Sequence, residues 1–486
     1  MFHIADVKKF RFCPRFFWLH NNGQALPRIQ FVRMEEKMTE LAKEKLKITS
    51  FFMGQRNDGN EVFQQGFQKE SWGINVRMEA KHLRIKVPLM QKTDDGYDIY
   101  FTYLGGKPKG DDVRYYSDQI WVMMELGIMI KDIFVIHLNQ EYVREELLDI
   151  DQCLSIATHF YTSKGLPSYL ITDHILDHVH GLSSSLEEMV RVYQDTIPDP
   201  IKLPRCYRRQ KCGYYHQCFP DELSDDHNSV WTLVNSSNKP QMVKQGILKL
   251  EEIEGDMIEG DRVQYAQIMA ARNGGIFFDR LAMTNWLSKV IKPISFLDFE
   301  WDLYAIPPYP GMRPMEVLPF QYSLHMLTEE GLKHEQFLGV GDCRLDFIES
   351  LLKNVPSEGT VFAYNADGAE KLRLLELARQ FPQYEEPLTA LAARLLDLAQ
   401  PLFMGLFYDV RLGGAFTLKK VIEIINPEFA YANLMIQHGL DAVELWRKAD
   451  ISDTLSEQLR EDLFAYCKRD TEAMVELYQY LEKLVK

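Results

Sequence analysis

The run Ile294–Glu300 (ISFLDFE) places two carboxylates in an otherwise apolar segment with the length of a β-strand. Side chains alternate across a strand, so we expect Asp298 and Glu300 on one face and Leu297 and Phe299 on the other. Two neighbouring carboxylates repel each other unless a cation lies between them. The run therefore predicts a buried strand whose acids are either solvated at its end or bound to a metal ion.

Composition limits what such a strand can belong to. The chain has 486 residues, of which 46% are hydrophobic and 26% charged, as expected for a globular protein of two or three domains. Lys and Arg number 55 against 70 Asp and Glu, and the net charge of −15 argues against a generally basic nucleic-acid coat protein. The sequence shows neither a membrane-length apolar run nor a signal-peptide pattern. We therefore expect a cytoplasmic protein with no membrane partner.

Periodicity divides the chain into three zones. Residues 1–225 mix helical and strand patterns, 226–290 predict a helical connector, and 291–486 alternate strands and helices as an α/β domain does. Predicted strands are Leu83–Met90, Tyr97–Leu104, Ile133–Leu138, Pro319–Leu327 and Thr360–Tyr364. Predicted helices are Met34–Leu46, Tyr116–Leu126, Ser183–Asp195, Asp346–Lys353, Glu370–Gln380, Ala390–Asp397 and Leu455–Leu484.

Two further segments carry acids that are able to reach the same point in space. On the last predicted helix, Tyr466 and Asp470 are four residues apart and so lie on one face. After the predicted strand at Thr360–Tyr364, an Asn is followed by Asp367 and Glu370. Each of these patterns alone is common on ordinary helix surfaces.

In this order, the three motifs resemble the DEDD superfamily of RNase H-like 3′–5′ exonucleases, in the subclass with a Tyr in its third motif. The resemblance implies two Mg²⁺ or Mn²⁺ ions, which clamp the attacking and leaving oxygens of a phosphodiester. It also implies that Asp298 bridges both ions and that Glu300 and Asp470 complete the sites. Tyr466 would orient, or help to deprotonate, the attacking water.

The middle motif departs from that family. The family reads Asn-x-x-Phe-Asp, with the acid four residues after the Asn, whereas the fourth residue after Asn365 is Ala369. Asp367 and Glu370 flank this position, and both remain candidate ligands. We favour Glu370 as the metal ligand after a one-residue insertion, with Asp367 as the N-cap of the following helix.

Four of the seven cysteines form a second pattern. Cys13 stands alone near the N-terminus, and Cys206, Cys212 and Cys218 are separated from one another by five residues. Clustered thiols in a reducing compartment usually indicate metal. These spacings favour a [4Fe–4S] cluster, with zinc as the alternative because its sites more often use two-residue spacings.

One cysteine at the front and three at the back resemble the RecB-like PD-(D/E)XK nucleases that carry an iron–sulfur site, a restriction-endonuclease-like fold. That fold needs an Asp on one strand and Glu-x-Lys on the next. The corresponding strands here offer Lys86 and Val87, then Phe101 and Tyr103. We therefore predict that this domain is inactive and retained for binding.

Basic residues lie among the three clustered cysteines. Arg205, Arg208, Arg209 and Lys211 are interleaved with tyrosines, a combination suited to contacting phosphates and stacking on bases. A solvated basic loop is an equally good interpretation.

Both halves together resemble a bacterial family of uncharacterised proteins that joins a RecB-like iron–sulfur region, a helical insert and a DEDD-type exonuclease domain. The resemblance implies a 3′–5′ exonuclease that acts on single-stranded ends of DNA or RNA. The alternative is a non-catalytic nucleic-acid-binding protein in which both nuclease centres are degenerate. A third hypothesis places activity at Glu79 and Lys81, which spell Glu-x-Lys ahead of the expected strand.

Overall fold

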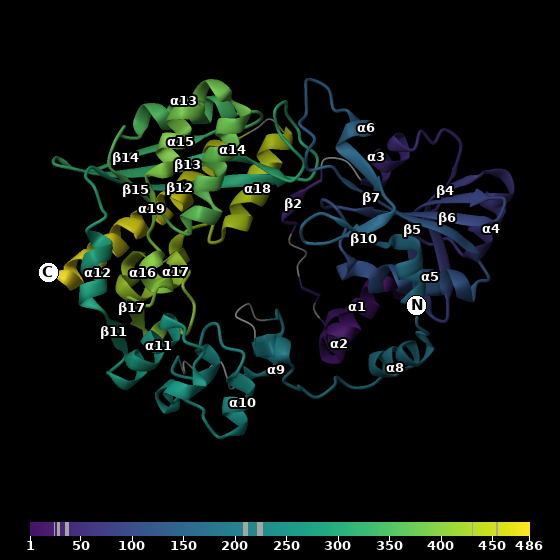
Figure 1. Cartoon of the computed structure of the whole chain (residues 1–486), viewed down its shortest axis with the longest axis horizontal. Helices are drawn as coiled ribbons and strands as arrows, with labels where there is room; N and C mark the ends of the chain where they lie inside the picture. The colour runs from purple at the N-terminus through teal and green to yellow at the C-terminus, as the bar shows by residue number, and fades with distance from the viewer. Residues whose placement is uncertain are drawn as a thin grey trace. The chain divides into compact units, whose positions relative to one another are not determined.

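The computed structural model describes residues 1–23, 25–26, 30–34, 38–207, 212–220, 227–429, 431–452 and 455–486. Within these ranges the chain has a mixed α/β fold and divides into two compact units (Figure 1). The N-terminal unit comprises Met1–Pro200 and Leu303–Glu316, and the C-terminal unit comprises Ile201–Asp302 and Val317–Lys486. The α/β class predicted from the sequence is confirmed.

A mixed sheet forms the centre of the N-terminal unit. β4 (Trp72–Ala80), β5 (Leu83–Thr93) and β6 (Gly96–Tyr103) pair antiparallel. The turn between β4 and β5 has positive φ angles of 47° at Lys81 and 67° at His82, as a two-residue hairpin that matches the strand twist requires. After β6 the chain crosses over through a helix, and β7 (Ile130–Leu138) pairs parallel to β6, whereas β8 (Leu154–Ala157) then pairs antiparallel to β7.

The other elements of this unit surround the meander. The crossover helix α5 (Val113–Glu125) packs its apolar face onto β4 and β5 in one buried cluster. The remaining strands are β1 (Phe2–His3), β2 (Val32–Arg33), β3 (Phe52–Met53), β7 (Ile130–Leu138), β8 (Leu154–Ala157), β9 (His159–Tyr161) and β10 (Pro167–Leu170). The helices are α1 (Ile4–Phe12), α2 (Pro14–Asn22), α3 (Met38–Lys45), α4 (Asn60–Lys69), α5 (Val113–Glu125), α6 (Ile150–Cys153), α7 (Ile171–Asp177) and α8 (Ser183–Gln194).

The main sheet of the C-terminal unit has the strand order β14-β13-β12-β15-β16, with β12 in the middle. β13 and β14 pair antiparallel, whereas β15 and β16 extend the sheet parallel to β12. The strands are β12 (Ile294–Tyr304), β13 (Glu316–Thr328), β14 (Gly331–Leu338), β15 (Thr360–Ala363) and β16 (Leu395–Asp397). The helices around them are α13 (Arg344–Asn354), α14 (Glu370–Gln380), α15 (Glu385–Ala393), α16 (Gln400–Phe403), α17 (Leu418–Ile425), α18 (Gly439–Ser452) and α19 (Glu457–Val485).

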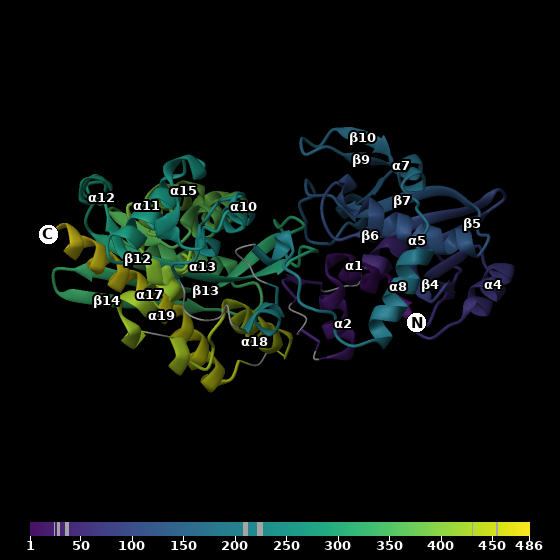
Figure 2. The same ribbon diagram turned by 90° about the horizontal axis from the view of Figure 1, so that it is seen from below.

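Helices cover both faces of this sheet. Leu297 and Phe299 of β12 share one buried cluster with α13, α14 and α15. On the other face runs α19, the long yellow helix that ends at the C-terminus in Figures 1 and 2, and its Tyr478 ring lies 5.8 Å from the ring of Phe296. The alternation predicted for β12 is thus confirmed, and its even-numbered residues face α19.

The predicted connector at 226–290 groups with the C-terminal unit in its described part. It contains α10 (Lys239–Lys244), α11 (Arg262–Arg272) and α12 (Arg280–Leu287), and it has a small apolar cluster of its own. β11 (Ile276–Phe278) pairs antiparallel with β17 (Phe407–Asp409), which ties the segment to the rest of the unit.

Most of the predicted elements appear, but the helix predicted at Ala390–Asp397 is wrong in its second half. α15 ends at Ala393, and Leu395–Asp397 forms β16, which pairs with β15. The apolar pattern continues through this boundary, so sequence periodicity does not reveal it. β14 was not predicted because, as an edge strand, it exposes most of its side chains and lacks an apolar alternation.

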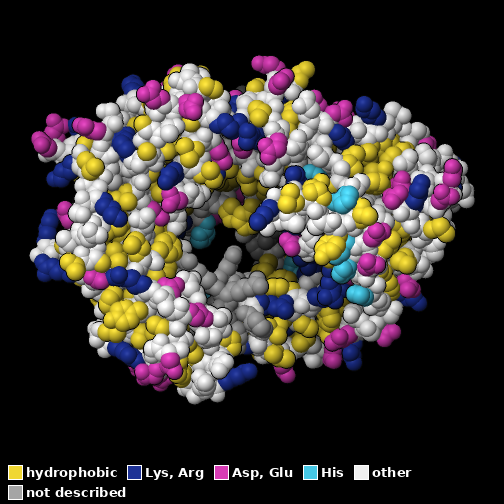
Figure 3. Space-filling view, viewed as in Figure 1, with side chains coloured by type: hydrophobic (Ala, Val, Ile, Leu, Met, Phe, Trp, Pro, Cys, Tyr) yellow, Lys and Arg dark blue, Asp and Glu magenta, His cyan; other side chains and the backbone are white. Residues whose placement is uncertain are grey.

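The surface of the described residues shows neither a membrane span nor a single charged patch on the face in view. No described helix combines the length with the apolar character that a bilayer crossing requires. In Figure 3, acidic and basic side chains are interspersed over the visible face of the C-terminal unit. The net charge of −15 is therefore not gathered into one patch on that face.

Candidate metal centre

The two acids of β12 lie where the neighbouring strand stops. β15 pairs with β12 through Phe296 and ends at Ala363, so Asp298 and Glu300 extend beyond the carboxyl end of β15. In open α/β sheets, ligands bind in the crevice outside the carboxyl ends of the strands. Both acids keep part of their surface exposed, although protein atoms closely surround their carboxylates.

The last helix brings a third acid to the same place. Tyr466 and Asp470 lie on the face of α19 that packs on β12, and they are 4% and 8% exposed. The carboxylates of Asp298, Glu300 and Asp470 each offer an oxygen within 4.8 Å of the others. Within the described ranges this is the one group of three His, Cys, Asp or Glu side chains with metal-ligand spacing.

The electrostatics of the group are unfavourable without a cation. Burial, followed by repulsion from Asp470, raises the pKa values of Asp298 and Glu300 well above their usual range, and Glu300 adds to the repulsion on Asp298. Burial also raises the pKa of Asp470 to about 6, against the opposing effect of a hydrogen bond from Tyr431 and of the nearby Lys419 ammonium. A bound divalent ion would reverse this penalty because it favours the ionised carboxylates.

Glu370 borders the group from α14. Its side chain is 2% exposed, and burial raises its pKa to about 8. The Oε2 atom is buried and finds no hydrogen-bond partner among the described residues. Glu370 also contributes to the raised pKa of Asp298, so it lies close enough to interact with it.

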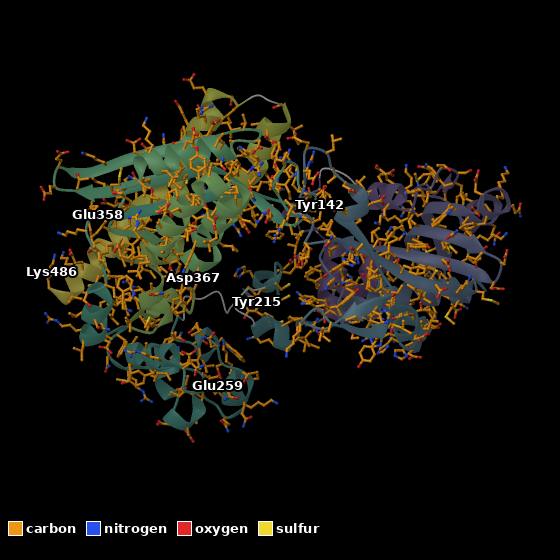
Figure 4. The ribbon with its side chains drawn as sticks, turned by 45° about the horizontal axis from the view of Figure 1, so that its top comes forward. Tyr142, Tyr215, Glu259, Glu358, Asp367 and Lys486 are labelled. Atoms are coloured by element: carbon orange, nitrogen blue, oxygen red, sulfur yellow. The ribbon has the colours of Figure 1, made fainter. Side chains whose placement is uncertain are left out.

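Asp367, the rival for the middle position, points elsewhere. It lies in a 3₁₀ turn at Ala366–Gly368, its side chain is 74% exposed, and it forms an ion pair of 3.0 Å with Lys371 (Figure 4). The prediction that Asp367 caps α14 is wrong, because Ala369 occupies the N-cap position. Asp367 lies two residues before the N-cap, and its carboxylate is exposed to solvent.

Hydrogen bonds to Asp397 stabilise the loop before α14. Asn365 adopts a left-handed conformation with φ of 60°, and its N–H donates to Asp397 Oδ1 at 2.9 Å. Asp397 also accepts from the N–H of Ala399 at 2.9 Å. Asp397 therefore stabilises the loop that presents Glu370.

Two residues next to the group escaped the sequence reasoning. Tyr431 donates to Asp470 Oδ1 at 2.6 Å, and Lys419 donates to the Tyr466 hydroxyl at 3.1 Å. Tyr431 belongs to a segment of short 3₁₀ turns with no apolar periodicity. In the sequence, Tyr431 is only an aromatic residue in a stretch without periodicity, and such a residue looks the same as one that packs in the core.

Cys467 lies beneath the acids. Its Sγ is 3.4 Å from Asp298 Oδ2, and burial raises the pKa of the thiol well above its usual value. The neutral thiol therefore donates a weak hydrogen bond to the carboxylate. Cys467 is therefore a direct neighbour of a candidate metal ligand.

The predicted iron–sulfur ligands lie in both units. Cys13 is the N-cap of α2 in the N-terminal unit, whereas Cys206, Cys212 and Cys218 belong to the C-terminal unit. All four are partly buried. Among the described residues no three of them meet the spacing that the acidic group meets, and the cluster stays a prediction.

The predicted basic loop is described only in part. Arg205 lies in a short 3₁₀ turn and is partly buried. Arg208, Arg209 and Lys211 lie outside the described residues. Of the alternative Glu-x-Lys pair, Glu79 accepts from Nε of Arg84 at 2.9 Å, and Lys81 lies in the β4–β5 turn.

Two comparisons with known proteins give matches to parts of the chain. A family described as a domain of unknown function (DUF2779) matches residues 295–417, which include three of the four acids but not Tyr466 or Asp470. An uncharacterized protein of Mycoplasma genitalium, MG366, is 29% identical over 165 residues. The match covers 31% of this chain and 24% of that protein, so it spans about a quarter of the relative's length.

Proposed function

We propose that the C-terminal unit is a divalent-metal-dependent 3′–5′ exonuclease of the RNase H-like DEDD type that acts on single-stranded ends of DNA or RNA. One observation carries the proposal: Asp298, Glu300 and Asp470, which come from a central strand and a helix about 170 residues later, converge within 4.8 Å. This is the set that the resemblance to the DEDD family implies. Glu370 from the middle motif borders it with a buried, unpartnered oxygen.

The donor set fits a hard cation. Mg²⁺ and Mn²⁺ prefer carboxylate oxygens and keep water as remaining ligands, and the partly exposed Asp298 and Glu300 leave room for both. Two such ions would stabilise the attacking and leaving oxygens of a phosphodiester. Asp298, between the other acids, would hold both ions, and Glu300, Asp470 and Glu370 would complete their ligands.

Tyr466 would orient the attacking water. Burial, together with repulsion from Asp470 and Glu300, raises its pKa, so the phenol stays neutral at physiological pH. A neutral hydroxyl both donates and accepts a hydrogen bond, which suits positioning a water molecule rather than removing its proton.

The N-terminal unit would bind substrate without cutting it. Where a RecB-like nuclease needs acids, Val87 and Phe101 are buried apolar side chains, 0% and 2% exposed. The cofactor proposed beside the metal pair is a [4Fe–4S] cluster on Cys13, Cys206, Cys212 and Cys218, or zinc in its place, and three of these cysteines belong to the C-terminal unit. Arg205 with Arg208, Arg209 and Lys211 would contact phosphates.

The test is digestion of end-labelled single- and double-stranded DNA and RNA by the full chain with Mg²⁺ or Mn²⁺. We expect loss of 3′ nucleotides from single strands, and at least a 100-fold slower reaction for Asp298→Asn and for Asp470→Asn. Because each substitution removes a repelling charge, the metal-free variants should melt no lower than wild type, which separates lost chemistry from unfolding. Equal rates for wild type and both variants would refute the site.

The irregular middle motif supports a second candidate. A non-catalytic nucleic-acid-binding protein would shift labelled oligonucleotides in a gel without shortening them under every divalent ion tested. Endonucleolytic cutting that survives Asp298→Asn but not Glu79→Gln would instead favour the N-terminal unit.

A further inference from the structure

Tyr431 is a hydrogen-bond partner of one acid in the candidate centre, Asp470. Its hydroxyl donates to Asp470 Oδ1 at 2.6 Å, and the two residues are 6% and 8% exposed. A carboxylate accepts only, so the phenol is the donor, and a bond from a neutral donor to an ionised acceptor is among the stronger kinds. Burial excludes water that would otherwise compete for the same oxygen.

Lys419 contacts both Tyr431 and Tyr466. Its ammonium lies 4.8 Å from the ring centre of Tyr431 and 4.8 Å from that of Tyr466. The same ammonium donates to the Tyr466 hydroxyl and to the carbonyl of Gln437. The contacts among Lys419, Tyr431 and Tyr466 therefore connect α17 and the turn at Tyr431–Asn433 to α19.

We propose that Tyr431 is a positioning residue, which holds Asp470 so that one carboxylate oxygen is taken by the phenol and the other is left for a divalent ion. Ligating carboxylates are commonly hydrogen-bonded by outer partners, and loss of such a partner typically weakens metal affinity or activity about 10–100-fold. This inference rests on the metal site of the proposed function. It adds a residue that the DEDD motifs do not contain.

The chain offers a matched control for this hydrogen bond. Tyr384 donates to Glu349 Oε1 at 2.6 Å, the same chemistry at the same length, on an exposed surface. Neither residue belongs to the acidic group. Tyr384→Phe removes one phenol-to-carboxylate bond without touching the centre.

The experiment is a calorimetric titration of the full chain with Mn²⁺ alone, without nucleic acid. Tyr431→Phe keeps the ring and should weaken Mn²⁺ binding about 10–100-fold. Tyr384→Phe should change it less than about twofold. The inference is overturned if Tyr431→Phe binds Mn²⁺ as tightly as wild type or as Tyr384→Phe.

A double-mutant cycle separates positioning from a general structural effect. If Tyr431 acts through Asp470, adding Tyr431→Phe to Asp470→Asn should cause no further loss of Mn²⁺ affinity. Adding it to Glu300→Gln should still weaken binding severalfold. An equal loss in both backgrounds means that the substitution disturbs the fold as a whole, and it would overturn the inference.

The readout distinguishes this inference from the proposed function. Wild type that binds Mn²⁺ with the expected Tyr431 effect but degrades no nucleic acid would remove the exonuclease proposal and leave the role of Tyr431 intact. If the wild type is an active exonuclease and Tyr431→Phe does not change its Mn²⁺ affinity, the exonuclease proposal stands and the role of Tyr431 is removed. Wild type without Mn²⁺ binding overturns both.

Discussion

Nε of Arg447 lies 3.0 Å from each carboxylate oxygen of Asp302, on the same face of β12 that carries Asp298 and Glu300. Asp302 is 0% exposed, and the guanidinium reaches it from α18. The two preceding acids on that face converge with Asp470 instead of with an arginine. One strand face therefore carries an acid with a built-in counter-ion and two acids whose repulsion a bound cation would relieve.

Substitution of Arg447 should destabilise the folded protein. Arg447→Met leaves the Asp302 carboxylate buried and unpaired, which lowers the free energy of unfolding by about 3–5 kcal/mol. Urea denaturation measures the change. The control is Lys333→Met, which breaks an ion pair with Glu330 on the surface and should lower the free energy of unfolding far less, because solvent screens this pair. A loss for Arg447→Met no larger than the control would contradict the structural role of this pair.

The acidic centre should make stability depend on pH in an unusual direction. The folded-state pKa values of Glu370, about 8, and Asp470, about 6, lie above their ordinary values, so the folded protein binds protons more tightly than the unfolded chain. Stability from these groups is present at low pH and is lost as the pH rises through 6 and 8. The metal-free protein should therefore melt at a lower temperature at pH 8.5 than at pH 6.5.

Magnesium should cancel that trend. Protons and Mg²⁺ compete for the same oxygens, so the increase in melting temperature caused by Mg²⁺ should grow between pH 6.5 and pH 8.5. Burial lowers the pKa values of His325 and His334 to about 3 and 4, so these histidines stay neutral in the folded state across this range. A Mg²⁺ effect that is flat across the range would argue against carboxylate binding.

The parts of the site that sequence predicted follow local rules. Strand alternation placed Asp298 beside Glu300, and helix spacing placed Tyr466 beside Asp470; neither rule depends on the rest of the fold. The convergence of the two motifs came from the family resemblance, because no local rule states which strand a helix packs against. The structure supplies that information through the packing of α19 on β12.

The parts that sequence did not predict depend on tertiary structure. Tyr431 meets Asp470 across 39 residues, from a stretch of 3₁₀ turns without periodicity. Asp367 has the right type and spacing for a helix cap, but the left-handed turn at Asn365 shifts the start of α14. In both cases the deciding interaction is a loop hydrogen bond, which carries no sequence pattern.

Substitutions can show which acid of the middle motif, Glu370 or Asp367, binds the metal ion. Glu370→Gln should slow nucleotide release at least about 10-fold and weaken Mn²⁺ binding, because it removes a buried oxygen that borders Asp298. Asp367→Asn should leave both unchanged, because its exposed carboxylate pairs with Lys371. Single-turnover digestion and Mn²⁺ titration of the two variants measure the difference, and the reverse ranking would assign the ligand to Asp367.

The cysteine pattern makes a separate prediction. The N–H of Tyr214 lies 3.5 Å from Cys212 Sγ, and backbone hydrogen bonds to sulfur are one way in which proteins tune iron–sulfur sites. Anaerobically purified protein should be brown, with about four iron and four sulfide per chain, and Cys212→Ala should lose most of both. Cys343→Ala, at a buried cysteine outside the pattern, should retain them. Colourless protein with stoichiometric zinc would identify a zinc site instead, and a cluster that survives Cys212→Ala would exclude this cysteine as a ligand.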